Sequence, residues 1–201
     1  MITCGRRRRP TVWDRIAIVQ GKDLLLDLLD DNTKRVHQLF DEVPDECLHW
    51  QPDPDANSIA VTLWHASRAF DVFMTQHNKN QTNDKEVWIQ SGWAGKSGYD
   101  PRGLGTNGWG MLTGYSLDKM RQIPKFGKEI LRGYYDEMFD VIRTYLEETS
   151  EEQLAQPAPG FEGKRTKFYW VRHPLFDLTR HVGEMLALKA MWERKQDSGA
   201  E

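Results

Sequence analysis

The chain has 201 residues, a length that predicts a single domain over 1–201, with the ends, 1–10 and 196–201, expected to be frayed. Its formal net charge of −3 and its pI of about 6.1 give no general attraction to nucleic acid or to anionic membranes. No apolar run approaches the roughly 18 residues that a membrane-spanning helix needs. We therefore expect neither nucleic acid nor a membrane as a partner.

Cysteine usage and the N-terminal charge indicate the compartment. Cys4 and Cys47 are too few for a disulfide framework, which favours a reducing, cytoplasmic location. The basic run Arg6–Arg9 is not followed by the apolar segment of a signal peptide, so we interpret it as a solvated terminus.

Residues 11–42 are predicted to form the first long helix, with Gly21 as an alternative start that would leave 11–20 as a separate extension. Its expected inner face consists of apolar residues at helical spacing: Leu24, Leu25, Leu28, Leu29, Val36, Leu39 and Phe40. Residues 43–57 contain three prolines, and no helix is expected to pass through them. In this loop Cys47 is predicted to be buried rather than reactive, and Trp50 to cover one end of a helical bundle.

A second helix is predicted to begin at a capping Asn57 or Ser58 and to run to about His77. His65 lies on the flank of its apolar face and, taken alone, is expected to be a half-buried histidine with a hydrogen-bonding neighbour. Arg68 and Asp71 are expected to form a surface pair or to contact the next segment.

Residues 78–125 differ from the rest because glycine and tryptophan are frequent and no phosphate-binding pattern is present. We interpret this segment as a packed excursion over one mouth of the bundle that shapes a pocket, with little regular structure. Within it, Ser116 is predicted to cap a short helix, 117–122, which Pro124 ends.

Two further long helices complete the predicted fold. The third covers about 127–148, and a polar connector over 150–163 leads to an extended stretch at 164–171. The last covers 173–195, with Pro174 as its first helical residue. Four amphipathic helices and almost no strand signal predict an all-α fold, a four-helix bundle.

The last helix carries the candidate chemistry. Asp177 and His181 are four residues apart, so their side chains lie one turn from each other on one face. His173 is too far along the axis to share a small ion with His181, and His65 of the second helix is the third candidate ligand. Two imidazoles and a carboxylate suit zinc, nickel or iron as a divalent metal. Asp177 is expected in the first turn, where the helix dipole favours a carboxylate; the alternative is that it only stabilises the helix start and that His181 is a core histidine.

Neighbouring residues could support such a centre. Gly183 inside a helix is expected to permit close approach of another backbone. Glu184 is the candidate catalytic residue, either as a general base or as a group that orients a ligand, with a plain surface glutamate as the alternative. Arg172 and Arg180 could hold an acidic substrate, or could simply solvate the helix.

These motifs resemble the DinB-like metal-binding four-helix bundle family over about 22–194. The resemblance is carried by 57-NSIAVTLWHASRAFD-71 and by Asp177-x-x-x-His181-x-Gly183-Glu184, which stands where the family has H-x-x-x-H-x-G-Q. Asp177 thus replaces the first histidine, and Glu184 the glutamine. The first departure is similar to the mycothiol-dependent maleylpyruvate isomerases, in which a carboxylate precedes the last histidine by four residues. The resemblance implies that His65, Asp177 and His181 bind a divalent metal.

Two functions follow as hypotheses. The first is a metal-dependent enzyme, a thiol-dependent transferase or isomerase or a hydrolase, acting on a small-molecule substrate with a low-molecular-weight thiol as a possible partner. The second is a non-catalytic helical bundle that binds a small ligand or a protein partner in a pocket lined by 78–125. A homodimer would follow if an apolar helix face stayed uncovered. A ferritin-like di-iron protein is excluded because such a site needs two Glu-x-x-His pairs, and the chain has one, Glu46 with His49.

Overall fold

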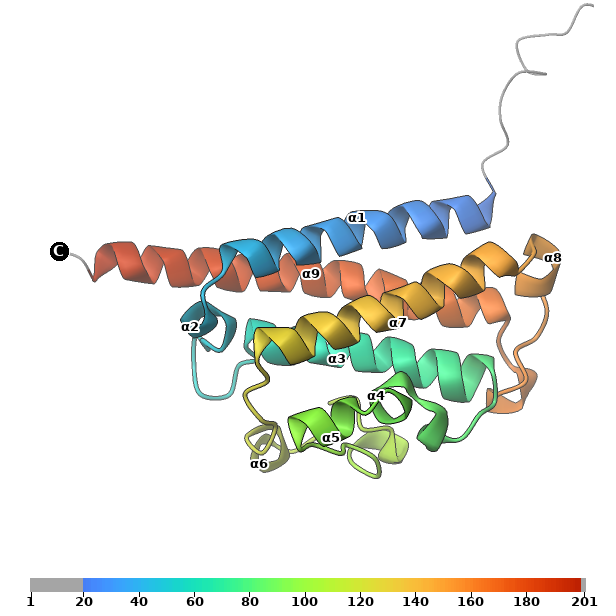
Figure 1. Ribbon diagram of the computed structural model, residues 1–201, viewed down its shortest axis with the longest axis horizontal. Helices are drawn as coiled ribbons and strands as arrows, with labels where there is room; N and C mark the ends of the chain where they lie inside the picture. The colour runs from blue at the N-terminus through green and yellow to red at the C-terminus, as the bar shows by residue number, and fades with distance from the viewer. Residues whose placement is uncertain (1–19, 200–201) are drawn as a thin grey trace, which may run out of the picture.

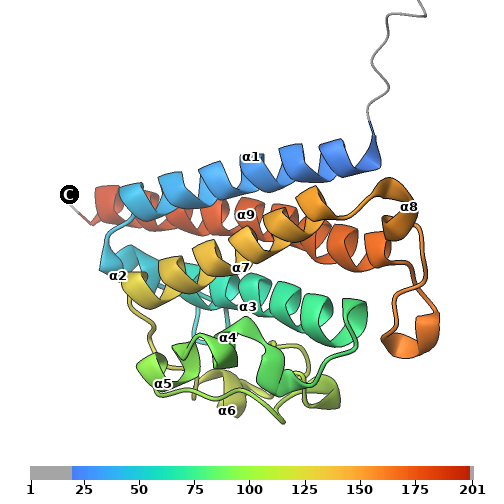
Figure 2. The same cartoon turned by 45° about the vertical axis from the view of Figure 1, so that its right-hand side comes forward.

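Four long helices lie side by side in the computed structural model, which describes residues 20–199 (Figures 1 and 2). They are α1 (Gly21–Glu42), α3 (Ile59–Val72), α7 (Lys128–Glu148) and α9 (Lys167–Ser198). Both α3 and α1 pack against α7 and α9. Within residues 20–199 no strand forms, and a single isolated bridge joins Pro157 to Thr166. The predicted all-α class is confirmed.

Short helices occupy the connections. They are α2 (Asp45–Leu48), η3 (Asn83–Lys85), α4 (Val87–Gln90), α5 (Trp93–Ser97), η4 (Thr106–Gly108), α6 (Leu117–Met120), α8 (Glu151–Leu154) and η5 (Phe161–Gly163). The helix α3 continues directly into a π-helical turn, η2 (Phe73–Asn78). The expectation that no helix lies in 43–57 is therefore wrong at Asp45–Leu48, where two acidic residues in the first turn favour a short helix despite the prolines.

The helix starts follow local capping chemistry. The Ser58 hydroxyl accepts a hydrogen bond from the backbone N–H of Val61 at the start of α3, and Ser116 does the same for α6, as predicted. The first helix begins at Gly21, the alternative start, and the proposed extension over 11–19 lies outside the described residues, as do Cys4 and Arg6–Arg9.

The last helix begins earlier than the predicted start at residue 173. Pro174 is not the first residue of α9 but lies inside it, and the expected extended stretch at 164–171 is helical from Lys167 onward. The Thr166 hydroxyl caps the helix at Tyr169 N, and Trp170 and Val171 are buried against the bundle. Capping and burial together outweigh the roughly 3 kcal/mol that an internal proline costs. At its other end α9 reaches Ser198, so part of the tail that we expected to be frayed is helical.

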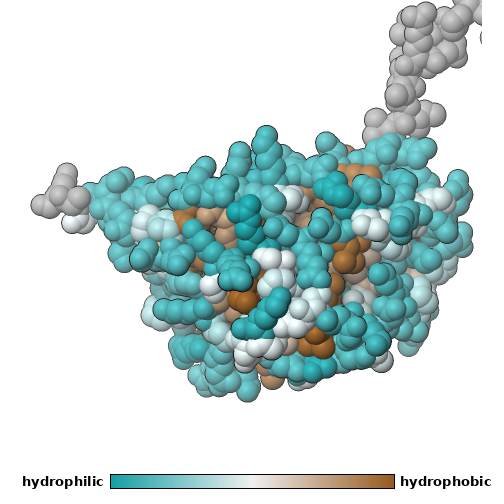
Figure 3. Space-filling view, in the orientation of Figure 1, coloured by the Kyte–Doolittle hydropathy of each residue, from teal (hydrophilic) through white to brown (hydrophobic). Residues whose placement is uncertain are grey.

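The core fills the space between the four helices, and most of the apolar positions that the periodicity predicts are buried in it. In α9, Leu178, Met185 and Leu188 recur at helical spacing and are all buried, while Leu24 of α1, expected on the inner face, is exposed. Cys47 is buried as predicted, and Trp50 packs half-buried against the core. The face seen in Figure 3 is mostly hydrophilic, with small hydrophobic patches between polar side chains. No helix in the described part of the chain is long and apolar enough to cross a membrane.

The segment 78–125 is packed against one side of the bundle, below α3 and α7 in Figure 1. Both α4 and α5 contact α7, and the side chains of Trp88 and Trp93 are buried. The packed excursion is thus as predicted, although it contains more helix than the glycine content indicates. Gly133 of α7 makes this contact possible, because a Cβ there would collide with the Trp93 ring.

Candidate metal centre

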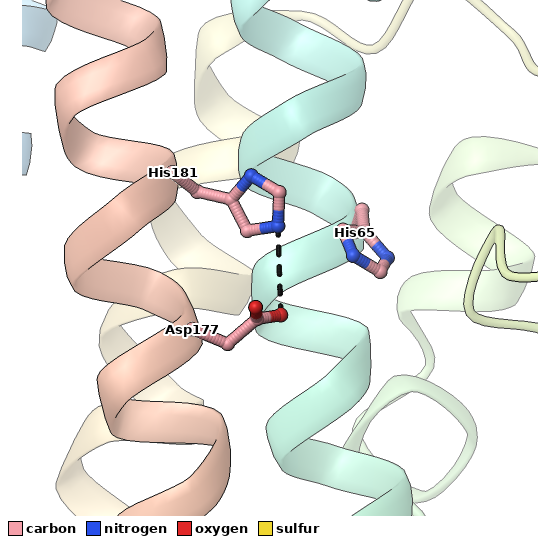
Figure 4. Close-up of side chains that lie close together, drawn as sticks. All are labelled: His65, Asp177 and His181. Carbon is pink, nitrogen blue, oxygen red and sulfur yellow. Dashed lines mark ion pairs between the residues drawn. The ribbon is translucent and has the colours of Figure 1, made fainter.

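Two neighbouring helices bring the three predicted ligands together. Asp177 and His181 project from successive turns of α9 towards α3, and His65 projects from α3 to meet them (Figure 4). One nitrogen or oxygen atom from each side chain lies within 4.8 Å of the other two. All three residues are intermediate between buried and exposed, so the cluster lies at the edge of the core, where small molecules can reach it.

The orientation of His65 is fixed by a backbone carbonyl. Its Nδ1 makes a short hydrogen bond to the carbonyl oxygen of Met111, in the excursion. A carbonyl can only accept, so Nδ1 carries the hydrogen and Nε2 keeps its lone pair. Burial lowers the pKa of His65, which favours the neutral ring. The His65 ring lies 5.0 Å from the His181 ring, centroid to centroid, at 86°.

Asp177 lies between two cationic partners. Its Oδ2 is 3.5 Å from Nε2 of His181, and its Oδ1 accepts a hydrogen bond from Arg180. The contact with His181 is the larger of the two effects, and together they hold the pKa of Asp177 well below its usual range. The expected helix-dipole explanation is wrong, because Asp177 lies well inside α9 and not in its first turn. The carboxylate is ionised because His181 and Arg180 stabilise its negative charge.

His181 is held from its other side by Glu184. The Nδ1 of His181 donates to a Glu184 carboxylate oxygen at 2.7 Å, and the Thr62 hydroxyl lies 3.4 Å from the other carboxylate oxygen. With hydrogen bonds to Asp177 and Glu184, the pKa of His181 rises to about 9. As at His65, an oxygen acceptor occupies Nδ1, which leaves Nε2 directed at the cluster.

The remaining candidates lie outside the cluster. His173 stacks on Tyr169, with ring centroids 5.3 Å apart, and does not join it, as the spacing predicts. Arg172 lies over the same Tyr169 ring, whereas Arg180 contacts Asp177. Gly183 has no close neighbour: a Cβ built there meets nothing within 4 Å. The expected close backbone approach at Gly183 is therefore wrong, because the residue is on the exposed side of α9.

A cavity of about 230 Å³ opens near the N-terminal end of α3. It is lined in part by His49, Ser58, Val61 and Lys125. Val61 precedes His65 by four residues, so both side chains lie on the same face of α3, one turn apart. The cavity thus begins one turn of α3 away from His65, and none of the three candidate ligands lines it.

The donor set meets the requirements of a divalent metal. Two neutral imidazole nitrogens and a carboxylate oxygen are common zinc ligands, and three protein ligands are typical of catalytic zinc sites with one open position. The distance between Asp177 Oδ2 and His181 Nε2, 3.5 Å, is close to the ~3.3 Å that separates two ligands of a tetrahedral zinc. Both histidines also have the oxygen partner at Nδ1 that metal-binding histidines almost always have.

Two groups next to this site leave no signal in the sequence. The carbonyl of Met111 is a backbone group, so no residue type marks it. Arg68 and Asp71 were expected as a surface pair or as a contact to the next segment; the surface alternative is wrong, because both side chains are fully buried, and they do contact that segment. The sequence pattern of an Arg and an Asp three residues apart on a helix is the same whether the pair lies on the surface or in the core.

Comparisons with known proteins agree with this fold. The family model of the DinB superfamily matches residues 28–185. A solved structure described as the crystal structure of the conserved protein of locus from Enterococcus faecalis superposes with a TM-score of 0.69 at 17% identity, covering 85% of this chain and 96% of that chain. At that identity the likeness shows the fold alone. Comparison with curated proteins finds no significant match.

Proposed function

This chain belongs to the DinB superfamily, and we propose that it is a divalent-metal-binding protein whose ligands are His65, Asp177 and His181. The observation that carries the proposal is the convergence of these three donors from α3 and α9 within 4.8 Å of one another. The held Nδ1 atoms of both histidines support it, because they leave both Nε2 atoms directed at the cluster; His181 must lose a proton before its Nε2 can bind an ion.

We further propose that the protein is an enzyme acting on a small molecule. A bound zinc, nickel or iron ion would supply Lewis acidity, lowering the pKa of a water molecule or of a thiol that it binds. The reaction classes are those that the family resemblance implies, a thiol-dependent transfer or isomerisation, with a low-molecular-weight thiol as co-substrate, or a hydrolysis. We assign the substrate to the cavity that Val61 lines, one turn of α3 away from His65.

The roles of the side chains follow from their contacts. His65 and His181 provide Nε2, and Asp177 provides its Oδ2. Glu184 holds the Nδ1 hydrogen of His181, which supports an orienting role; the general-base role stays a prediction. Arg180, which is exposed and shares Asp177 with His181, supplies positive charge at the mouth of the site.

Metal titration of protein purified without a nickel column tests the proposal. We expect one equivalent of zinc to bind to the wild type, and His65→Ala, Asp177→Ala and His181→Ala each to weaken binding at least tenfold. His37→Ala is the matched control, because His37 also contacts a carboxylate, Asp136, at 2.6 Å, but outside the cluster. Wild-type protein that binds no divalent ion, or cluster variants that bind like the control, would contradict it.

A further inference from the structure

A second, fully buried group of charges lies beside the metal centre. Arg68 of α3 pairs with Asp71 at 3.1 Å and with Glu86 at 2.8 Å, and the three side chains are at most 1% exposed. Burying charges costs desolvation energy that the pairing roughly offsets, so such a group is weak evidence for stability. The group does fix how α3 and the excursion lie against each other, because Arg68 is on α3 and Glu86 is in the excursion.

The guanidinium of Arg68 holds the backbone of the excursion next to the site. Its Nε donates to the carbonyl of Gly110 at 3.2 Å, and its Nη2 to the carbonyl of Trp109 at 3.3 Å. The next carbonyl along the chain, that of Met111, accepts the hydrogen bond from His65. A continuous path therefore runs from the buried charges to one candidate ligand.

The backbone around Met111 is not in a relaxed conformation. Gly110 has φ of 63° and Leu112 has φ of 76°, so left-handed residues flank Met111 on both sides. At Gly110 only glycine fits, because a Cβ would collide with the carbonyl oxygen of Pro101. At Leu112 this conformation is strained and persists only where its surroundings impose it.

We propose that Arg68 is a positioning residue of the metal centre: it holds the carbonyls of Trp109 and Gly110, and so fixes the Met111 carbonyl that orients the His65 ring. The effect on metal affinity rests on the proposed function. The effect on the His65 ring does not, because it depends only on hydrogen bonds between residues of the chain.

The geometry requires an arginine. The three guanidinium nitrogens of Arg68 donate four hydrogen bonds, two to backbone carbonyls and one to each carboxylate. A lysine ammonium has three donors at a single point and cannot reach all of these oxygens. The two carboxylates are themselves held in place and so fix the guanidinium. Asp71 accepts hydrogen bonds from the backbone N–H groups of Val87 and Trp88, and Glu86 accepts one from the side chain of Gln76.

The test compares Arg68→Lys with Ile142→Ala, which truncates a fully buried apolar side chain of α7 and so lowers stability without removing any hydrogen bond of Arg68 or His65. In metal-free protein, nitrogen NMR of the histidine rings reports the tautomer of each ring. We expect His65 to be in the Nδ1–H form in the wild type and in Ile142→Ala, and to become a mixture of tautomers in Arg68→Lys. Zinc affinity, measured by competition with a chelator, is expected to fall about 10- to 100-fold in Arg68→Lys only.

The outcomes separate the two proposals. Arg68→Lys with a wild-type His65 tautomer and wild-type zinc affinity overturns the positioning role. A changed tautomer in a protein whose wild type binds no zinc keeps Arg68 as the residue that orients His65 and contradicts the proposed function instead. If Arg68→Lys does not fold, Glu86→Gln is tested by the same two measurements. The amide has a single acceptor oxygen, which cannot accept from both Arg68 and Gln76. We expect a mixture of His65 tautomers and a loss of zinc affinity of at least threefold; wild-type values for both would overturn the positioning role.

Discussion

His181 lies between two carboxylates, and the proposed metal binding should depend on pH for this reason. Its pKa is raised from 6.5 to about 9, so at neutral pH the metal-free ring is protonated. A metal needs the neutral ring, so binding must release that proton. His65, with a lowered pKa, and Asp177, with a strongly lowered one, are already in their ligating forms.

We therefore predict that apparent zinc affinity rises roughly tenfold per pH unit between about pH 7 and 9 and then levels off. Calorimetry in buffers of different ionisation enthalpy should report about one proton released at neutral pH. Affinity that is constant over this range would contradict the raised pKa. In metal-free protein the same shift contributes stability that is present below pH 6.5 and is lost as pH rises through about 9.

Glu184 lies next to His181, and its substitution distinguishes its two possible roles. We predict that Glu184→Ala lowers zinc affinity about 10- to 100-fold, because His181 loses the acceptor at Nδ1. Glu184→Gln keeps an acceptor oxygen there and should bind zinc within a few-fold of the wild type. If affinity is the same in all three proteins, the orienting role is wrong; a loss of turnover alone would then favour the general base.

At the scale of helices, two glycines have opposite surroundings. Gly133 of α7 lies under the Trp93 ring, whereas Gly183 of α9 has open space at its Cβ position. We predict that Gly183→Ala raises the free energy of unfolding by about 0.5–1 kcal/mol, because alanine restricts the unfolded chain and favours helix. Gly133→Ala should lower it by about 1–3 kcal/mol, since Trp93 must move. Urea denaturation measures both; destabilisation by Gly183→Ala would mean that another part of the protein covers this face.

The long helices could be predicted because apolar spacing reflects burial directly, and α7 matches its predicted span within a residue. The start of α9 could not be predicted, since Pro174 fits the usual first position, and only tertiary burial of Trp170 and Val171 shows that the helix begins earlier. The close packing expected at Gly183 was wrong for a related reason. A glycine inside a helix can lie under another backbone or face open space, and the sequence alone does not distinguish the two.

The candidate ligands were predictable to different degrees. Asp177 and His181 lie four apart on one helix, so their proximity follows from helical geometry alone. His65 joins them only through the packing of α3 on α9, which the family resemblance implied and helical periodicity did not. The groups that hold His65 could not be predicted, because they combine a backbone carbonyl with an arginine whose burial depends on a segment 18 residues further along the chain.

For the whole molecule, a metal that joins α3 to α9 should stabilise the fold. Zinc at about 100 times its dissociation constant would add about 2.7 kcal/mol, which for a chain of this size raises Tm by about 5–10 °C. We predict this increase for the wild type, its reversal by a chelator, and its absence in His65→Ala. The metal-free protein should stay folded, because the core between the four helices contains no metal ligand. Loss of helical circular dichroism on chelation would contradict that last point.

Anomalous scattering from a crystal grown with zinc tests the central claim most directly, because it locates the ion by its own absorption edge. The arrangement of α3 and α9 predicts one strong peak, about 2.0–2.2 Å from Nε2 of His65, an oxygen of Asp177 and Nε2 of His181. A peak elsewhere, or none between these three side chains at saturating zinc, would contradict the proposed metal centre.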